Sequence, residues 1–356
     1  MTLVSLMGVC LSAQVKVKRE GEIFHCSNLK SFSLSELKKA TRNFHPNSLL
    51  GGGFGSVFKG WIDENSLVPA KPGTGIGIAV KRLKQSGLPD HTEWLAEVDY
   101  CGQFSHPHLA RLIGYCLEDK HRLLVFEFMP RGSLDNHLFS RRHSHFQPLS
   151  WSLRLKVALD VAKGLAFLHS AETNLMCVHF NTTSVLLDSN YNAKLSAFGL
   201  LKHRQISNIG HCMQLEFSSG GYIAPEILLT GFYTAKGTVY NFGVVLLEMF
   251  TGERLMDRNR PTGQQNLLEW VRPYLANKRK VLKVLDTHLE GQYSVEEAYE
   301  LATLTLRCIS TSPRFRPKID EVVTLLEQLQ APNNADSGNQ IPSSSESRPS
   351  ASILYT

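Results

Sequence analysis

The order of two sequence textures constrains this chain most strongly, because short β-like runs come first and long helical patterns follow. Between residues 48 and 130 the β-like runs read SVFKGW, IGIAVKRL and RLLVFEFM, and one helical stretch, HTEWLAEVDYCGQF, interrupts them. After residue 132 the amphipathic patterns WSLRLKVALDVAKGLAFLHS, KGTVYNFGVVLLEMFTG, EEAYELATLTLRCIS and KIDEVVTLLEQLQ dominate. A small β-rich lobe with one helix, followed by a larger helical lobe, predicts an α+β protein with a cleft between the lobes.

Composition sets wide limits on the class of protein. The chain has 356 residues, of which 42% are hydrophobic and 20% charged, so a sizeable core can be buried. The net charge of +6 comes from scattered basic residues, which argues against nucleic acid as a partner. Seven cysteines without zinc-ligand spacing are typical of reduced cytosolic thiols. No apolar run approaches the ~18 residues that span a bilayer, and the opening MTLVSLMGVCLSA lacks the basic region of a secretory signal.

The same patterns divide the chain. We expect a flexible arm at residues 1–35, because this segment is mixed in composition and poorly periodic. A folded domain follows at 36–331, with a first lobe to about residue 130 and a second from about 131. Residues 332–356 are rich in Ser, Asn and Pro, and we expect them to be a disordered tail.

A glycine-rich segment, LLGGGFGSVFKG at residues 49–60, precedes the first β-like run. Gly51, Gly52, Gly53 and Gly55 would allow backbone N–H groups to approach phosphate oxygens closely, with Val57 on the strand that follows. A tight hairpin turn explains the same glycines equally well. The motif alone therefore decides nothing.

Three further signals are weak one by one. Lys81 in IAVKRL has apolar neighbours that suggest a cleft, although lysine usually lies on the surface. Glu97, on the expected helix, would pair with Lys81 and aim it at phosphates, or else be a solvated helix residue. Glu226 ends the run Ala-Pro-Glu, and Arg316 in FRPKIDEVV is a candidate partner for a buried carboxylate.

Taken together and in order, these pieces match the protein-kinase signature set. The stretches FSLSELKKATRNFHPNSLLGGGFGSVFKGWID, EWLAEVDYCGQFSHPHLARLIGYC, LLVFEFMPRGSLDNHLF and NLLEWVRPYLANKRKVLKVLD resemble plant receptor-like cytoplasmic kinases, in the group that includes the avirulence-susceptible decoy kinases. The resemblance covers roughly residues 31–331 and implies the two-lobed protein kinase fold. It also implies that Phe126 is a bulky gatekeeper and that Glu127 to Met129 form the hinge for a nucleotide.

The catalytic segment departs from the family pattern Y-R-D-F-K-x-x-N-I-L-L-D, because it reads CVHFNTTSVLLD. His179 stands at the proton-accepting aspartate, Val178 at the arginine before it, and Asn181 at the lysine that assists transfer. Ser184 replaces the metal-binding asparagine, and Ala197 in SAFG replaces the second metal ligand. The resemblance thus predicts that no catalytic set is intact and that neither metal ligand remains.

Each loss has a physical cost. General-base catalysis contributes about 10² to 10⁴ in rate, and Mg²⁺ neutralises the charge that develops in the transition state. The glycine loop LLGGGFG also departs from the family's L-G-E-G-G-F-G, which puts Gly51 out of phase with the family's first glycine unless a β-bulge restores the register. Thr238 replaces an aspartate that in the family supports the catalytic loop. We therefore leave ATP binding open and disfavour Mg²⁺.

A lipidation pattern, MGVCLS, begins at Met7. If translation starts there, Gly8 fits N-myristoylation and Cys10 fits palmitoylation, which together would anchor the chain at the cytoplasmic face of the plasma membrane. If translation starts at Met1, myristoylation is abolished and we expect a cytoplasmic protein.

The leading hypothesis is a pseudokinase scaffold or decoy in plant membrane-proximal receptor or immune signalling. Its partners would be other protein kinases, receptor kinases or immune receptors, and pathogen effectors. One alternative is a serine/threonine kinase with weak residual transfer that uses Lys81 and His179. Another is a switch that binds ATP without transferring phosphate.

Overall fold

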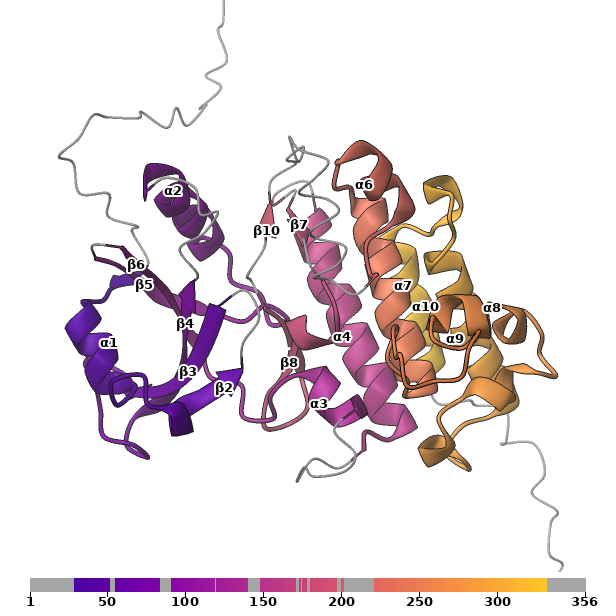
Figure 1. Cartoon of the computed structure of the whole chain (residues 1–356), viewed down its shortest axis with the longest axis horizontal. Coiled ribbons are helices and arrows are strands. Elements are labelled where there is room, and N and C mark those ends of the chain that lie inside the picture. The colour runs from indigo at the N-terminus through magenta and orange to yellow at the C-terminus, as the bar shows by residue number, and fades with distance from the viewer. Residues whose placement is uncertain are drawn as a thin grey trace, which may run out of the picture. The chain divides into compact units, whose positions relative to one another are not determined.

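The structure, a computed structural model, describes residues 29–51, 55–83, 91–118, 120–139, 148–170, 173, 175–177, 180–196, 200–201 and 221–331. It divides the chain into two compact units. The first contains the residues up to Ser105 together with Arg111–Phe128, and the second contains His106–Ala110 together with the chain from Met129. The first is built on a sheet and the second mainly on helices (Figure 1), so the expected α+β class is confirmed.

A six-stranded sheet forms the first unit, in the order β1-β5-β6-β4-β3-β2. The strands are β1 (Lys30–Ser31), β2 (Leu49–Gly51), β3 (Gly55–Ile62), β4 (Ile76–Leu83), β5 (Leu112–Glu118) and β6 (His121–Glu127). Neighbouring strands pair antiparallel except β1, which runs parallel to β5. The runs expected from sequence became β3, β4 and β6, and the interrupting helix is α2 (His91–Gly102).

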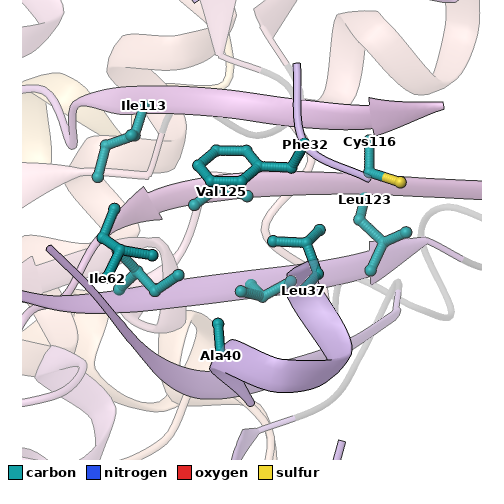
Figure 2. Packing of buried hydrophobic residues seen from close by; sticks show 10 residues of the cluster. Phe32, Leu37, Ala40, Ile62, Ile113, Cys116, Leu123 and Val125 are labelled. Carbon is teal, nitrogen blue, oxygen red and sulfur yellow. The ribbon is translucent and has the colours of Figure 1, made fainter. Parts of the chain in front are cut away.

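One face of this sheet carries the core of the first unit. Ile78 and Val80 alternate along β4 with side chains of the other face, as the period of two in a strand requires. Helix α1 (Leu34–Ala40) packs its buried Leu37 into the cluster that these residues form (Figure 2). A capping box between Ser33 and Glu36 satisfies the first N–H groups of α1 and fixes where the helix begins.

The chain is already folded before residue 36, so the expected arm at 1–35 is too long. The backbone N–H of Phe32 donates to the carbonyl of Tyr115 at 2.8 Å, which continues the pairing of β1. The Phe32 ring is only 2% exposed and belongs to the core (Figure 2). A two-residue strand has no periodicity of its own, and its partner strand lies far along the chain, so no local pattern announces it.

The second unit contains the helices α3 (Leu134–Phe139), α4 (Trp151–His169), α6 (Pro225–Thr230), α7 (Ala235–Thr251), α8 (Leu267–Leu275), α9 (Val295–Cys308) and α10 (Ile319–Gln330). Two short antiparallel pairs accompany them: β7 (Met176–Cys177) with β10 (Leu200–Leu201), and β8 (Val185–Leu187) with β9 (Ala193–Leu195). Helix α7 is buried over nearly its whole length and packs on α4 and α9, while α10 packs on α4 (Figure 1). Among the described residues, no helix combines the length and apolar character needed to cross a membrane.

Candidate functional site

Lys81 lies on the face of the first unit's sheet opposite the core. Its position alternates with Val80, which is buried in the core cluster, so the two side chains point to opposite faces. In the antiparallel register Lys81 pairs with Val57 of β3 and with Leu124 of β6. Residues directly opposite one another share a face, so Val57 and Lys81 lie side by side.

Burial changes the chemistry of this lysine. Removal from water lowers the pKa of the Lys81 ammonium from 10.5 to about 7. Ala79 and Phe126, the predicted gatekeeper, also pair across β4 and β6 on this face, so apolar side chains adjoin the lysine. A poorly hydrated ammonium beside apolar surface is suited to an anionic group. Glu97 lies on α2, and its side chain is outside the described residues.

A β-bulge lies at the start of the glycine loop, between Leu49 and Gly51. Leu49 pairs with Phe58 and Gly51 pairs with Val57, so two steps on β2 oppose one step on β3. A bulge at this point shifts the register of Gly51 relative to β3 by one residue. Gly52 and Gly53 lie outside the described residues, so the loop itself stays a prediction.

Gly55, the first residue of β3, is required by its backbone. Its φ is +151°, and a Cβ atom there would lie 2.3 Å from the carbonyl oxygen of Arg82. No other residue fits without moving β4. At the end of the glycine segment, the backbone of β3 therefore lies too close to that of β4 for any side chain to fit.

The predicted hinge residues fall at the end of the sheet. Glu127 closes β6: its N–H donates to the carbonyl of Arg111 at 3.0 Å, and its Oε1 accepts from the Arg111 N–H at 2.8 Å. These two hydrogen bonds tie the end of β6 to the segment before β5. Met129 is 6% exposed and is the first residue of the second unit after Phe128.

In the second unit, Asn181 acts as a local cap. Its side-chain oxygen accepts from the backbone N–H of Thr183 at 2.9 Å and from the Thr183 hydroxyl at 2.6 Å. The short 3₁₀ turn Thr182–Ser184 begins at this cap. An amide held in a turn in this way supplies no positive charge to a phosphoryl group.

Ser184, at the end of this turn, is held by its backbone. Its N–H donates to the Asn181 carbonyl at 3.0 Å, and its carbonyl accepts from Ser196 at 2.8 Å. A neutral hydroxyl is a poorer ligand for Mg²⁺ than the carboxylate and carbonyl oxygens that this ion prefers. Within the described ranges, no group of three or more His, Cys, Asp or Glu side chains could hold a metal ion.

Strands β7 and β10 pair with each other, and in the sequence they flank the predicted positions His179 and Ala197. Cys177 pairs with Leu200. His179 and Ala197, which lie just inside that pair in sequence, are outside the described residues. The lipidation candidates Gly8 and Cys10 are outside them as well.

The structure brings Glu226 and Arg316 together. Nη1 of Arg316 donates to Oε1 of Glu226 at 2.6 Å, and Nη2 donates to Oε2 at 2.7 Å. The arginine side chain has 0% exposure and the glutamate side chain 20%. The pair joins the start of α6 to the segment before α10, and further carbonyls, including that of Lys236, accept from the guanidinium.

A second buried carboxylate was missed in the sequence. The Tyr222 hydroxyl donates to Glu248 on α7, and the Leu255 N–H donates to its other oxygen at 2.7 Å. Burial raises the pKa of Glu248 from 4.5 to about 7, against the hydrogen bond from Tyr222, which lowers it. The signal was present, because a glutamate inside the apolar run VVLLEMF must find a partner. Thr238, which the resemblance placed at the position of a supporting aspartate, is another buried polar residue of α7.

Comparison with known proteins agrees with the geometry of both units. Residues 45–326 match the family described as protein tyrosine and serine/threonine kinase. The chain is 56% identical over 364 residues to "Probable serine/threonine-protein kinase PBL9" of Arabidopsis thaliana, covering 94% of this chain and 88% of that protein. It is 56% identical over 332 residues to "Receptor-like cytoplasmic kinase 176" of Oryza sativa subsp. japonica, covering 93% and 84%. It is 52% identical over 314 residues to "Serine/threonine-protein kinase BIK1" of Arabidopsis thaliana, covering 88% and 79%.

Proposed function

Because this chain belongs to the protein kinase family, and within it to the plant receptor-like cytoplasmic kinases, we propose that it signals by binding, with impaired phosphotransfer. The observation that carries the proposal is the replacement of charged and metal-binding side chains at the positions where a kinase carries out transfer. Asn181 and Ser184, which stand at two of those positions, form a capped turn. His179 and Ala197 change two more in the sequence.

The cofactor of the family makes this proposal specific for ATP and Mg²⁺. Protein kinases bind ATP with Mg²⁺ and use the ions to bridge and neutralise the phosphates. The sheet face of Val57, Ala79 and Lys81 suits a nucleotide, because it joins apolar side chains to a desolvated ammonium. The donor set for Mg²⁺ does not fit, since Ser184 offers one hydroxyl and Ala197 offers no ligand atom.

The relatives support a second candidate, a serine/threonine kinase. All three relatives are named as kinases, and their names taken alone favour this candidate over a pseudokinase. His179 would then accept the substrate proton, since imidazole titrates near pH ~6.5. A third candidate is a switch that binds ATP through Lys81 without transferring phosphate, and the bulge at Gly51 favours it.

Partners and location follow from the same membership as proposals. Receptor kinases, other protein kinases or immune receptors would dock on the intact kinase scaffold, and pathogen effectors would act on it as a decoy. Acylation at Gly8 and Cys10 would hold the chain at the cytoplasmic face of the plasma membrane. Expression with translation forced from Met1 or from Met7, followed by mass analysis of the N-terminal peptide and by cell fractionation, tests this part.

Thermal unfolding of the full chain with ATP, with and without Mg²⁺, tests the main proposal. A ligand at ~100 times its dissociation constant stabilises the folded state by about 2.7 kcal/mol, a readily measured shift. We expect no increase in melting temperature that depends on Mg²⁺. A shift with ATP alone, lost in Lys81→Met, would favour the switch. A shift that requires Mg²⁺ would contradict our assignment of Ser184 and Ala197 and would favour the kinase.

A further inference from the structure

A hollow on the second unit contains none of the residues predicted to bind nucleotide or metal or to transfer phosphate. Its volume is about 560 Å³, within the range of ~300–1,000 Å³ seen for ligand sites. Three elements of the second unit surround it: the loop before β5, helix α4 and helix α10. The residues that line it, here named the α4–α10 groove, are His106, Pro107, His108, Lys163, Ala166, Phe167, Asp320, Val323 and Thr324.

Much of the groove lining is apolar, and two aromatic rings stack in it. The ring of His106 stacks on that of Phe167, with centroids 4.5 Å apart and planes inclined by 14°. Nδ1 of His106 accepts from the His108 N–H at 3.2 Å, which leaves the neutral imidazole with its proton on Nε2. Partial burial and the neighbouring His108 lower the pKa of His106, which favours the neutral form of its ring at neutral pH. Pro107, Ala166 and Val323 complete the apolar lining.

The two helices of the groove are fixed to each other at its rim. Lys163 of α4 and Glu327 of α10 form an ion pair at 2.8 Å. Helix α10 also packs along α4. The groove is therefore a standing feature of this unit, and an apolar segment can cover it without rearranging the helices.

One segment of the chain is close enough in sequence to reach the groove. Helix α10 ends at Gln330, six residues after Thr324, and thus roughly 9 Å beyond the groove at 1.5 Å per residue. The sequence after Ala331 is polar for most of its length and then carries three consecutive large apolar residues, Ile353, Leu354 and Tyr355. A linker of about 20 residues has a root-mean-square span of roughly 25 Å when it is a random coil, more than the return path requires.

Tethering makes even a weak contact effective. A short flexible linker presents its end at an effective concentration on the order of millimolar. Three adjacent apolar side chains would each be stabilised by leaving water. The apolar ring of Phe167 and the side chain of Val323 offer such a surface on a groove of suitable size.

We propose that Ile353, Leu354 and Tyr355 of the same chain dock in the α4–α10 groove and cover Phe167 and Val323. The segment then acts as an internal occupant, which a partner protein with a similar apolar motif must displace before it can use the groove. This proposal is independent of phosphotransfer, because no residue of the groove belongs to the positions discussed for nucleotide or metal.

Site-directed photocrosslinking of the full chain tests the proposal. A benzophenone amino acid at position 355 should form crosslinks within one chain to peptides that contain Phe167 or Val323. The same probe at position 341, earlier in the tail, is the matched control and should give at least fivefold less of these products. Crosslinks from position 355 that map elsewhere in the chain would overturn the proposal. A product of doubled mass that grows with protein concentration would also overturn it, by assigning the groove to a second copy.

Two substitutions on α10 separate docking from folding. Val323→Glu places a charge in the groove and should reduce the crosslink from position 355 at least fivefold. Gln328→Glu adds the same charge to an exposed position of α10 that does not line the groove, and should leave the crosslink unchanged. The melting temperature of each variant reports whether it folds. An undiminished crosslink in folded Val323→Glu would refute docking in this groove.

Discussion

The guanidinium of Arg316 donates two parallel hydrogen bonds to the carboxylate of Glu226, at 2.6 and 2.7 Å. Ninety residues separate the two in sequence, so this bidentate pair fixes the start of α6 against the segment that leads into α10. Because the arginine side chain has 0% exposure, its charge depends on the glutamate and on nearby carbonyls. The pair belongs to the scaffold of the second unit.

Glu226→Gln should therefore destabilise the chain strongly. Removing one partner leaves a buried positive charge uncompensated, which costs about 3 to 5 kcal/mol. The 20% exposure of the Glu226 side chain favours the lower end of this range. Urea denaturation of the full chain measures the change. Glu296→Gln removes the exposed ion pair to Lys278 and is the control, with little change expected. Equal effects of the two substitutions would contradict the structural role of the buried pair.

Glu248 should make stability depend on pH. Its pKa in the folded chain is about 7, above the ordinary value of 4.5, so the folded state holds a proton that the unfolded state releases. The stabilising contribution is complete below pH 4.5 and is lost as the pH rises to about 7. Each unit of pKa difference corresponds to about 1.4 kcal/mol.

Glu248→Gln removes this titration, so the difference between the denaturation midpoints of the two chains should vary between pH 4.5 and 7. Tyr222→Phe deletes the hydrogen bond that lowers the pKa of Glu248 and should move the window to higher pH. Parallel curves for all three chains would show that Glu248 is not the group that titrates.

Gly55→Ala should weaken the first unit because of its backbone conformation. A Cβ at a φ of +151° would lie 2.3 Å from the carbonyl oxygen of Arg82, so β3 and β4 must separate. We expect a loss of about 2 kcal/mol or more, as for other strained backbone substitutions. The control is Gly51→Ala, because a Cβ there meets nothing within 4 Å. A loss in Gly51→Ala as large as that in Gly55→Ala would disprove the argument from close approach.

Lys81→Met should remove a second pH dependence, of opposite sign. The folded pKa of about 7 lies below the ordinary 10.5, so the folded chain releases a proton that the unfolded chain retains. Stability therefore rises with pH between about 7 and 10.5 in the unmodified chain and less so in Lys81→Met. Melting temperatures across this range provide the measurement, with the exposed Lys71→Met as the control for loss of one charge. A rise of the same size in Lys81→Met would contradict the assignment.

Much of the fold could be predicted from local pattern. The alternation in IGIAVKRL placed Lys81 on a strand, and the structure adds that Val57 and Leu124 flank it. The long helical patterns became α4, α7, α9 and α10, because an apolar stripe of helical period is a strong and local signal. The sequence named Arg316 as a candidate partner for Glu226, and the two are joined by hydrogen bonds in the structure.

The remaining features depend on contacts that are distant in sequence. Strand β1 needs β5 as its neighbour, and strand β5 was not marked as a strand from its sequence. The bulge at Gly51 depends on the register with β3, which one strand cannot reveal by itself. The capping role of Asn181 was likewise invisible, since the family pattern assigned that position to a different task.

Phosphate transfer from ATP is the measurement that tests the central claim most directly. The full chain would be compared with a variant that restores the family residues at four positions: His179→Asp, Asn181→Lys, Ser184→Asn and Ala197→Asp. General-base catalysis alone contributes about 10² to 10⁴ in rate, so we predict that the unmodified chain transfers at least about 100-fold more slowly. Transfer by the unmodified chain at a rate similar to that of the restored variant, abolished by Lys81→Met, would contradict the account and establish an active kinase.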